Sequence, residues 1–591
     1  MTSRAIPYRH LGRHGFIAVM MLCLFGLCIP QNAEAQRKRN RPGDERIYLD
    51  HADSLYFDQY KKRDTQIVRG HVKFRHQGAT LFCDSAYFQQ QENTFRAFGH
   101  VRMIQGDTLE IKCDTAFYDG RADVEMVHAQ SNVVVIHRKT SELHTDNLIL
   151  DRKFDIVYYD DGGNYADRAK GVTLSSDWGK YNLSTKEAEF FYDVTLKTKS
   201  HVITTDTLLY YPSDERAHVL GGWTVYPPQG GPPKWTKSKI HSIRDGYDVE
   251  TTNCYFYMNT ERTELFDKST ITTDTRTISG DSLFYDSNKK ASKGYGRVKY
   301  VDQKNKNQLT ADAVEYDEIT GKGIATKNPV FLDYSQTDTL YLHADTIRME
   351  TFYLDTDSMY RKVHCYRKVR MFRNDVQAVC DSMVICSLDS TLTMYGDPIV
   401  WNANRQLLGD SIRVLMNDST VREANIMSKA LSIEIQNDLK NPEKTYFNQV
   451  TSKVMNAYFE EGKMRMSEAI GSVQTIYYPV EESDSSILFM SYLETDTLRM
   501  FLTPERKMEK IWASKSEGTL YPLVQIPAGK DYLPNFGWYD YIRPVNKDDI
   551  YYIPGRHDKS SSPSNVGDAP YSLTKRMRQV RIADRPDNDN Q

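Results

Sequence analysis

The stretch Leu342-His343-Ala344-Asp345-Thr346-Ile347-Arg348-Met349 contains the pattern that decides the fold. At its centre a small residue is followed by aspartate, by serine or threonine, and by an apolar residue. The same signature returns as Gly280-Asp281-Ser282-Leu283 and Cys83-Asp84-Ser85-Ala86, and it recurs along nearly the whole chain. A recurrence of this kind is typical of a chain that stacks one supersecondary unit many times.

The aspartates of this signature mark the period. The clearest copies contain Asp53, Asp84, Asp114, Asp206, Asp281, Asp345, Asp381, Asp410 and Asp496, and looser copies contain Asp146, Asp177 and Asp312. From Asp53 to Asp206, successive aspartates are 29 to 32 residues apart. We therefore expect function to reside in the array rather than in a single pocket.

Apolar and polar residues alternate on both sides of each aspartate, which indicates β-strands. The alternation changes parity at the signature, because apolar residues shift from odd positions before the aspartate to even positions after it. A regular strand would place these two sets on opposite faces. A bulge or corner at the Asp-Ser/Thr step removes the conflict, and the polar side chains there can bond to nearby backbone. We interpret the aspartate row as structural, not as a catalytic or metal-binding ladder.

A second strand signature opens on glycine, as in Gly70-His71-Val72, Gly99-His100-Val101 and Gly296-Arg297-Val298. The valine and the residue two positions on form an apolar face, while charged residues alternate outward. Short polar turns such as Asp286-Ser287-Asn288-Lys289 leave no room for crossover helices. These features predict an all-β fold, an elongated repeat of stacked antiparallel strands with a period of about 31 residues.

The chain begins with the features of a secretory signal peptide. Basic residues precede an apolar run from Phe16 to Ile29, and Ala33-Glu34-Ala35 follows as a cleavage pattern. We expect residues 1–35 to be removed and residues 36–46 to form a basic linker. The mature protein is then expected in the periplasm, with association with the outer membrane as a further expectation. The 76 basic and 79 acidic residues are interleaved, which argues against a nucleic-acid-binding surface.

Six cysteines lie beyond the signal segment, without the spacing or the neighbouring histidines of a metal site. Cys83, Cys113 and Cys380 fill the small position before the repeat aspartate, which favours buried apolar side chains. A disulfide between Cys83 and Cys113, which occupy equivalent positions in neighbouring units, is the alternative. No metal or cofactor is expected.

The serial units resemble those of the OstA-like family, the organic-solvent-tolerance and lipopolysaccharide-transport proteins of the periplasm. Residues 278–286 and 309–317 match best, with the pattern Leu/Ile-x-Gly/Ala-Asp-x-apolar-x-Tyr-Asp. The resemblance covers roughly residues 47 to 525. It implies a β-jellyroll, also called a β-taco, whose apolar groove shields the acyl chains of lipopolysaccharide. It also implies other lipopolysaccharide-transport proteins as partners.

Composition and period together predict the domain boundaries. A stretch rich in proline and glycine, 227–270, interrupts the period, so the jellyroll repeats are expected in two halves, 47–226 and 271–525. Residues 526–591 are expected to form an aromatic cap and a disordered polar tail, too short and polar for a transmembrane barrel.

The ends of the stack are the candidate contacts with partner proteins. An open jellyroll leaves unpaired strand edges, which a strand of a neighbouring protein can extend. We expect such edges in the units near residues 47–74 and 493–522.

Inward-facing rows supply the candidate ligand-binding residues. These are the apolar side chains that follow each aspartate, together with the valine row and its neighbours. They are Leu81, Ala86, Phe88, Val101, Met103, Ile111, Ala116, Tyr118, Leu208, Tyr210, Leu283, Tyr285, Val298, Val314 and Tyr316. With these residues as groove lining, the protein is expected to be non-enzymatic, to bind lipopolysaccharide or a related lipid, and to be peripheral to membranes at most.

Two other functions remain open at this point. The first is a structural or adhesive β-solenoid with a closed core, which would carry no lipid. The second, a secreted polysaccharide-degrading enzyme, ranks lower because the carboxylates recur in register as corner residues. Neither Gly-x-Ser-x-Gly nor His-Glu-x-x-His occurs.

Overall fold

The computed structural model describes residues 46–551 except for 58–63, 108, 212, 223, 226–233, 236, 355, 418–419, 439, 442, 482–485 and 506–507. The expected signal peptide, nearly all of the basic linker and the polar tail from residue 552 lie outside the described residues. The chain divides into two compact units. The first comprises residues 1–139 and 149–154, and the second comprises residues 140–148 and 155–591.

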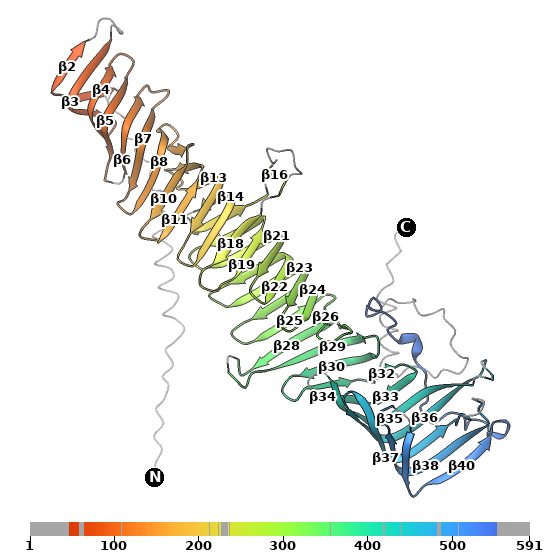
Figure 1. Ribbon diagram of the computed structural model, residues 1–591. Coiled ribbons are helices and arrows are strands. Elements are labelled where there is room, and N and C mark those ends of the chain that lie inside the picture. The colour runs from red at the N-terminus through yellow and green to blue at the C-terminus, as the bar shows by residue number, and fades with distance from the viewer. Residues whose placement is uncertain are drawn as a thin grey trace, which may run out of the picture. The chain divides into compact units, whose positions relative to one another are not determined.

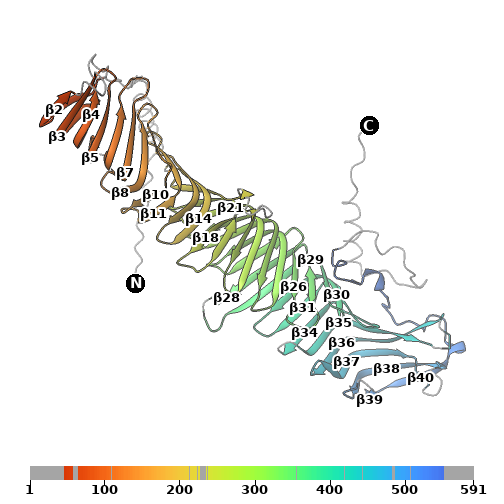
Figure 2. The same cartoon turned by 45° about the horizontal axis from the view of Figure 1, so that its top comes forward.

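The first unit is built of antiparallel strands, most of them paired with the next strand along the chain. They are β1 (Tyr48–His51), β2 (Ser54–Phe57), β3 (Thr65–His76), β4 (Ala79–Gln89), β5 (Thr94–Gln105), β6 (Leu109–Asp119) and β7 (Met126–His137). Strands β1 and β2 both pair with β3, and the ladder then runs from β3 to β7. Figures 1 and 2 show these strands side by side, in red and orange. Strand β8 (Ser141–Asp151) begins in the second unit and ends in the first.

The second unit continues the same antiparallel pattern. Its strands are β9 (Ile156–Tyr159), β10 (Gly163–Asp167), β11 (Val172–Ser176), β12 (Trp178–Asn182), β13 (Ala188–Lys197), β14 (His201–Tyr211), β15 (Arg216–Leu220), β16 (Thr224–Val225), β17 (Lys234–Trp235), β18 (Ser238–Ser242), β19 (Asp248–Thr251), β20 (Asn253–Tyr257), β21 (Arg262–Thr272), β22 (Arg276–Asp286), β23 (Ala291–Asp302), β24 (Asn307–Asp317), β25 (Lys322–Thr326), β26 (Val330–Asp333), β27 (Leu340–His343), β28 (Thr346–Phe352), β29 (Tyr360–Phe372), β30 (Gln377–Cys386), β31 (Thr391–Tyr395), β32 (Ile399–Asn402), β33 (Arg405–Leu408), β34 (Ser411–Asn417), β35 (Thr420–Asn437), β36 (Thr445–Glu460), β37 (Lys463–Tyr477), β38 (Phe489–Leu502), β39 (Met508–Ser514) and β40 (Glu517–Pro522).

Two short 3-10 helices, Leu523–Gln525 and Asp540–Ile542, complete the described residues, which contain no α-helix. The predicted all-β repeat of antiparallel strands is therefore confirmed. Within the described part of the chain, no helix has the length and apolar character needed to cross a membrane.

Each long strand bends at the repeat signature. In the β3–β4 ladder, Gly70 and His71 together stand opposite Asp84. The same shift of register recurs in β22–β23, β29–β30 and β35–β36. A bulge at every corner explains why the apolar alternation changes parity there, as predicted from the sequence.

Glycine opens the second signature because the backbone is left-handed at that position. At Gly296, φ is +69°, and an added Cβ would lie 2.6 Å from Oδ2 of Asp281. Both the conformation and the space therefore favour glycine at this position.

Two corner aspartates, Asp84 and Asp281, bond to side chains across the ladder, whereas Asp312 accepts a hydrogen bond from the backbone N–H of Arg297. Asp84 lies 2.7 Å from Nδ1 of His100, and Arg297 Nη2 donates to Asp281 at 2.7 Å. The bulge turns the residue after the glycine toward the carboxylate of the neighbouring strand, so a side chain reaches it first. All four of these side chains are exposed, which is consistent with a structural role for the aspartate row.

The corner divides each long strand into two arms. We call the stretch before the repeat aspartate the leading arm and the stretch after it the trailing arm, and each arm includes the segments of neighbouring strands that pair with it. In the first unit, Phe74 of the leading arm stacks on Phe95 of the trailing arm, with ring centroids 4.5 Å apart. The inner faces of the two arms therefore meet and form the core.

Residues 526–551 run along the outer face of the leading arm in the second unit. Gln406 of β33 accepts a hydrogen bond from the backbone N–H of Tyr539 at 2.8 Å and donates to the carbonyl of Gly537 at 2.7 Å. Trp538 packs with Trp401 in the same buried group. The aromatic segment expected as a cap thus lies against the side of the sheet.

The break in the repeat is shorter than the predicted 227–270. Strand β18 pairs with β14, and β19 pairs with β21, so residues 238–257 belong to the ladder. Strands β16 and β17 form a separate two-stranded sheet between β15 and β18. Prolines and glycines cluster only before residue 234, and strand alternation resumes directly after it.

The alternative of a disulfide between Cys83 and Cys113 is wrong. Strand β5 lies between β4 and β6, so the two residues are two strand spacings apart. That separation is about 9.6 Å, beyond the roughly 7 Å that a disulfide can span between Cα atoms. Both thiols are free and buried, and burial raises the pKa of each to about 12.

Candidate functional site

All candidate residues of the first unit lie on the inner faces of the two arms, as predicted. They are Leu81, Ala86, Phe88, Val101, Met103, Ile111, Ala116 and Tyr118, and none is more than 4% exposed. Lys112, which alternates with them on β6, is exposed. These side chains thus face the interior, and in this unit they are packed against one another.

A stack of aromatic rings fills the interior of the first unit. Phe74 lies 5.3 Å from Phe88 and 4.5 Å from Phe95, and Phe95 lies 5.1 Å from Tyr118, measured between ring centroids. Because these rings come from both arms, they occupy the space that a groove would need.

A polar tie joins the outer ends of the two arms in this unit. The hydroxyl of Tyr118 on the trailing arm shares a hydrogen bond with Nδ1 of His76 on the leading arm. Arg152 donates to the same hydroxyl at 2.8 Å. Burial raises the pKa of Tyr118, and the neighbouring Arg152 opposes that shift. The tie holds the arms together where they would otherwise separate.

The candidate residues of the second unit fall into two classes. Leu208, Leu283 and Val298 are buried near the corner, whereas Tyr210, Tyr285, Val314 and Tyr316 are only half-buried. Tyr210 lies beside Lys170, whose ammonium donates to its hydroxyl at 3.3 Å. The inner face is therefore closed at Leu208, Leu283 and Val298, and partly accessible at Val314 and at the tyrosines farther from the corner.

Strands β21–β24 repeat strands β3–β6 with an offset of 197 or 198 residues, as the corner pairs Asp84/Asp281 and Asp114/Asp312 show. The matched inner positions can thus be compared directly. Those that are buried in the first unit and half-buried in the second are Leu81/Ile278, Phe88/Tyr285, Met103/Tyr300, Ile111/Leu309, Ala116/Val314 and Tyr118/Tyr316. The inner face is therefore buried in strands β3–β6 and partly accessible in strands β21–β24.

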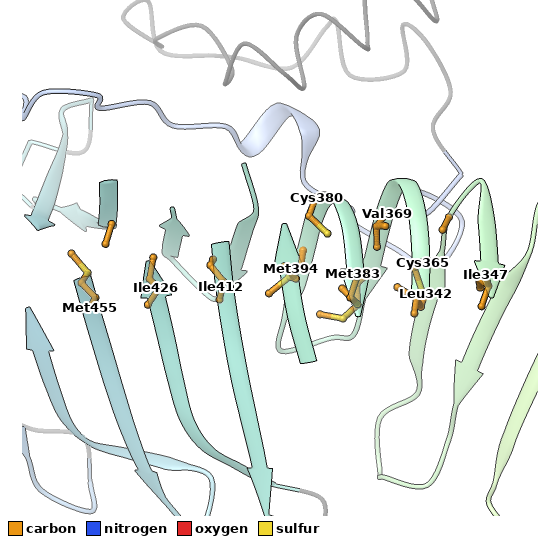
Figure 3. Packing of buried hydrophobic residues seen from close by; sticks show 14 of the residues in the cluster. Leu342, Ile347, Cys365, Val369, Cys380, Met383, Met394, Ile412, Ile426 and Met455 are labelled. Atoms are coloured by element: carbon orange, nitrogen blue, oxygen red, sulfur yellow. The ribbon is translucent and has the colours of Figure 1, made fainter. Parts of the chain in front are cut away.

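We call the inner face of β22–β29 the open trough. Its floor, near the corner, is lined by small or medium residues such as Gly280, Gly294, Ala311 and Ala325, all buried. Farther along the unit the floor continues as a row that includes Ile347, Cys365, Met383 and Met394, whose side chains Figure 3 shows between the strands. Half-buried apolar residues, among them Leu309, Val314, Leu340 and Val363, pack on this floor.

The aromatic stack is incomplete in the open trough. The positions of Phe74 and Phe95 are taken by Ile271 and Ser292, so two of its four rings are missing. Tyr285 and Tyr316 keep the other two positions, and burial raises the pKa of Tyr285 to about 12. Their phenol groups stand at the outer ends of the arms, above the apolar floor.

Several residues of the open trough were absent from the sequence prediction, among them Ile278, Tyr300, Leu309, Met349 and Val363. All have the parity of the inner face, because Tyr300 pairs with Ile278 and Leu309, and Val363 pairs with Met349. The repeat offset alone would have found the first three of them. An open apolar surface of this kind can bind extended apolar groups.

The described residues contain no group of His, Cys, Asp and Glu side chains that could hold a metal ion. The carboxylates near the inner face stand at strand ends, as Asp302 does beside Arg276.

Comparisons with known proteins place this fold in context. A family model described as an OstA-like protein matches residues 44–206 and 237–340. Among solved structures, the chain is similar to LptH, the LptA-homologous periplasmic component of the lipopolysaccharide transport device from Pseudomonas aeruginosa. The identity is 12% and the TM-score 0.20, over 23% of this chain and 97% of that chain. No curated protein matches the sequence.

Proposed function

This chain belongs to the OstA-like family, and on that premise we propose that it is a non-enzymatic lipid-binding protein of lipopolysaccharide transport. In this proposal the acyl chains of the lipid lie in the open trough of the second unit. The protein works in the periplasm and helps move lipopolysaccharide toward the outer membrane.

One observation carries the proposal: the inner positions that are sealed in the first unit are half-exposed in the second. Val314 and Leu309 are apolar, face the interior and yet remain partly accessible. Burying a methylene group there stabilises a complex by about 0.8 kcal/mol, so one acyl chain of a dozen methylenes supplies roughly 10 kcal/mol before its ordering cost.

The repeat gives a reason why such a trough suits transport. Each hairpin presents nearly the same inner residues as the next, so an acyl chain can move between sites of similar affinity. The sequence holds no glycine-rich loop ending in Gly-Lys-Ser/Thr, so direction must come from an energy source in a partner.

Partners of the transport pathway would join at the strand edges. Strands β1 and β2 each pair only with β3, and β39 and β40 each pair only with β38, among the described residues. Each of these edges has backbone groups available to a strand from another protein.

The first unit favours the alternative role, a structural β-solenoid. Its interior is filled by the aromatic stack and tied by Tyr118. In this reading the closed unit provides rigidity or an attachment surface while the open trough binds lipid.

Lipid analysis of the purified protein tests the proposal. We expect wild-type protein from envelope extracts to retain lipopolysaccharide, detected by mass spectrometry. Val314→Arg should lose most of it, because the charge enters the apolar trough beside Gly294 and Ala325. Glu315→Arg, on the exposed outer face, is the matched control and should retain the lipid. Folded wild-type protein without lipid would contradict the proposal and favour the structural role.

A further inference from the structure

Two buried hydrogen-bond donors at the outer end of the open trough have no partner among the described residues. They are Nε of Arg361 and Oγ1 of Thr351. The two residues pair directly across β28–β29. They share the inner face with Ile347 and Cys365, which lie an even number of residues away and belong to the buried floor.

Such an arrangement is costly unless something binds there. Burying a hydrogen-bond donor without an acceptor destabilises the fold, and more so when the donor is charged. Thr351 is only 9% exposed, so water does not readily replace the missing hydrogen-bond partner of its hydroxyl. Two of these donors side by side therefore indicate a ligand that carries several acceptor oxygens.

Further donors approach from both arms. Burial raises the pKa of Tyr300 on the leading arm and of Tyr316 on the trailing arm, and the guanidinium groups of Arg276 and Arg361 oppose both shifts. Each phenol thus lies within electrostatic reach of both arginines.

The two arginines differ in whether a carboxylate balances their charge. Arg276 has a carboxylate partner, since its Nε lies 3.7 Å from Asp302. Glu318 and Asp317 act on Tyr316, but Arg361 forms no ion pair within the part of the chain that the structure describes. A partly buried cation without a counter-charge is destabilising, so an anion bound beside it would be stabilised.

We infer that Arg361 and Thr351 form an oxyanion-binding site whose ligand is a phosphate monoester at the end of an acylated lipid. A phosphate group has enough oxygens to accept from the guanidinium fork, from the threonine hydroxyl and from the nearby phenols at once. The inference rests on the proposed function, because the acyl chains on the floor of the trough bring the phosphate to its outer end. It extends the proposed ligand from the acyl chains to the headgroup. In this inference the trough recognises the negative charge of the phosphate as well as the length of the acyl chains.

Binding measurements on the full chain test this inference. The probes are the bisphosphorylated lipid portion of lipopolysaccharide and the same lipid after removal of its phosphates. Wild-type protein should bind the phosphorylated lipid at least about tenfold more tightly, because a hydrogen bond to a charged group contributes about 1.5–3 kcal/mol. Arg361→Gln should abolish that preference, and Thr351→Val should reduce it severalfold.

The neighbouring Lys362 supplies the matched control. It lies on the outer face, with its ammonium 5.6 Å from the ring centroid of Phe352. Lys362→Gln removes the same charge and should leave the preference unchanged. Arg361→Lys keeps the charge but not the fork, so it should retain part of the preference and serves if Arg361→Gln does not fold. Thermal unfolding checks each variant.

The outcomes separate the two proposals. Equal binding of both lipids by wild-type protein, or equal effects of Arg361→Gln and Lys362→Gln, overturns the phosphate site and leaves lipid binding intact. Binding of neither lipid by folded protein overturns the proposed function as well. Millimolar inorganic phosphate should change lipid binding by less than about twofold, and full displacement would assign the site to free phosphate instead.

Discussion

Strands β3–β6 and strands β21–β24 are two copies of one repeat that differ in how far their inner faces are buried. At the corner they agree, since Val101 and Val298 are equally buried and both corners carry a glycine with positive φ. Away from the corner they diverge, and the first copy is sealed where the second is open. The corner specifies the fold, while the outer inward-facing residues specify whether the arms close.

The physical cause of the difference is ring volume and one polar tie. Four aromatic rings bridge the arms of the first unit, and Tyr118 bonds to His76. In the second unit Ser292 stands where Phe95 stands in the first. The arms there lose packing contacts that would hold them together.

The largest expected effect comes from removing one ring of the closed copy. Phe95→Ser should lower the free energy of unfolding by about 3–5 kcal/mol, because a buried ring is lost and a hydroxyl is left in an apolar interior. Urea denaturation measures it. The control Arg96→Ser changes an exposed residue of the same strand and should cost less than about 0.5 kcal/mol. A small effect of Phe95→Ser would show that the first unit is not sealed by packing.

Corner substitutions should affect both copies equally. Gly99→Ala and Gly296→Ala should each lower stability by about 2 kcal/mol, since φ is positive and the new Cβ meets the carboxylate of Asp84 or Asp281. The same denaturation experiment applies. Gly78→Ala is the control with positive φ but nothing within 4 Å, so only the conformational cost of about 1 kcal/mol remains. Unequal effects at the two corners would break the claim that the corner is shared.

Removing one tyrosine hydroxyl from each copy should change the stability of the two copies by different amounts. Tyr118→Phe loses hydrogen bonds to His76 and Arg152 and should lower stability by about 1–2 kcal/mol. Tyr316→Phe, at the matched position, should change stability by less than about 0.5 kcal/mol. Equal effects would mean that the tie does not distinguish the closed copy.

The smallest effect concerns the titration of the corners in the first unit. The hydrogen bond that Nδ1 of His100 donates to the Asp84 carboxylate raises the pKa of His100 above its usual 6.5. The pairing therefore stabilises the folded state fully below about pH 6.5 and is lost as the pH rises through the raised value. NMR titration should show this raised pKa, and Asp84→Asn should lower it toward the ordinary value. The corner of Asp281 pairs with Arg297 and should not titrate in that range.

Local features of the fold could be predicted from the sequence. The parity change around Asp84 and the glycine at Gly99 are consequences of backbone geometry within one hairpin, so a short window contains the information. The inward rows follow from the same parity, which is why Leu81 and Tyr118 were placed correctly.

Long-range features could not be predicted in this way. Closure of the first unit depends on the contact between Phe74 and Phe95 across the interior, and the sequence of neither strand alone predicts that contact. The outer-face segment depends on Gln406 bonding to Tyr539, 133 residues later. A buried glutamine in a strand gives no sign of a partner so distant in the chain.

The most direct test of lipid binding in the open copy is site-specific photo-crosslinking in cells at Tyr316 and at Tyr118, with the exposed Glu315 as the outward control. Our account predicts lipopolysaccharide adducts at Tyr316 and none at Tyr118 or Glu315. Adducts of equal yield at Tyr118 and Tyr316, or adducts at Glu315 alone, would contradict it.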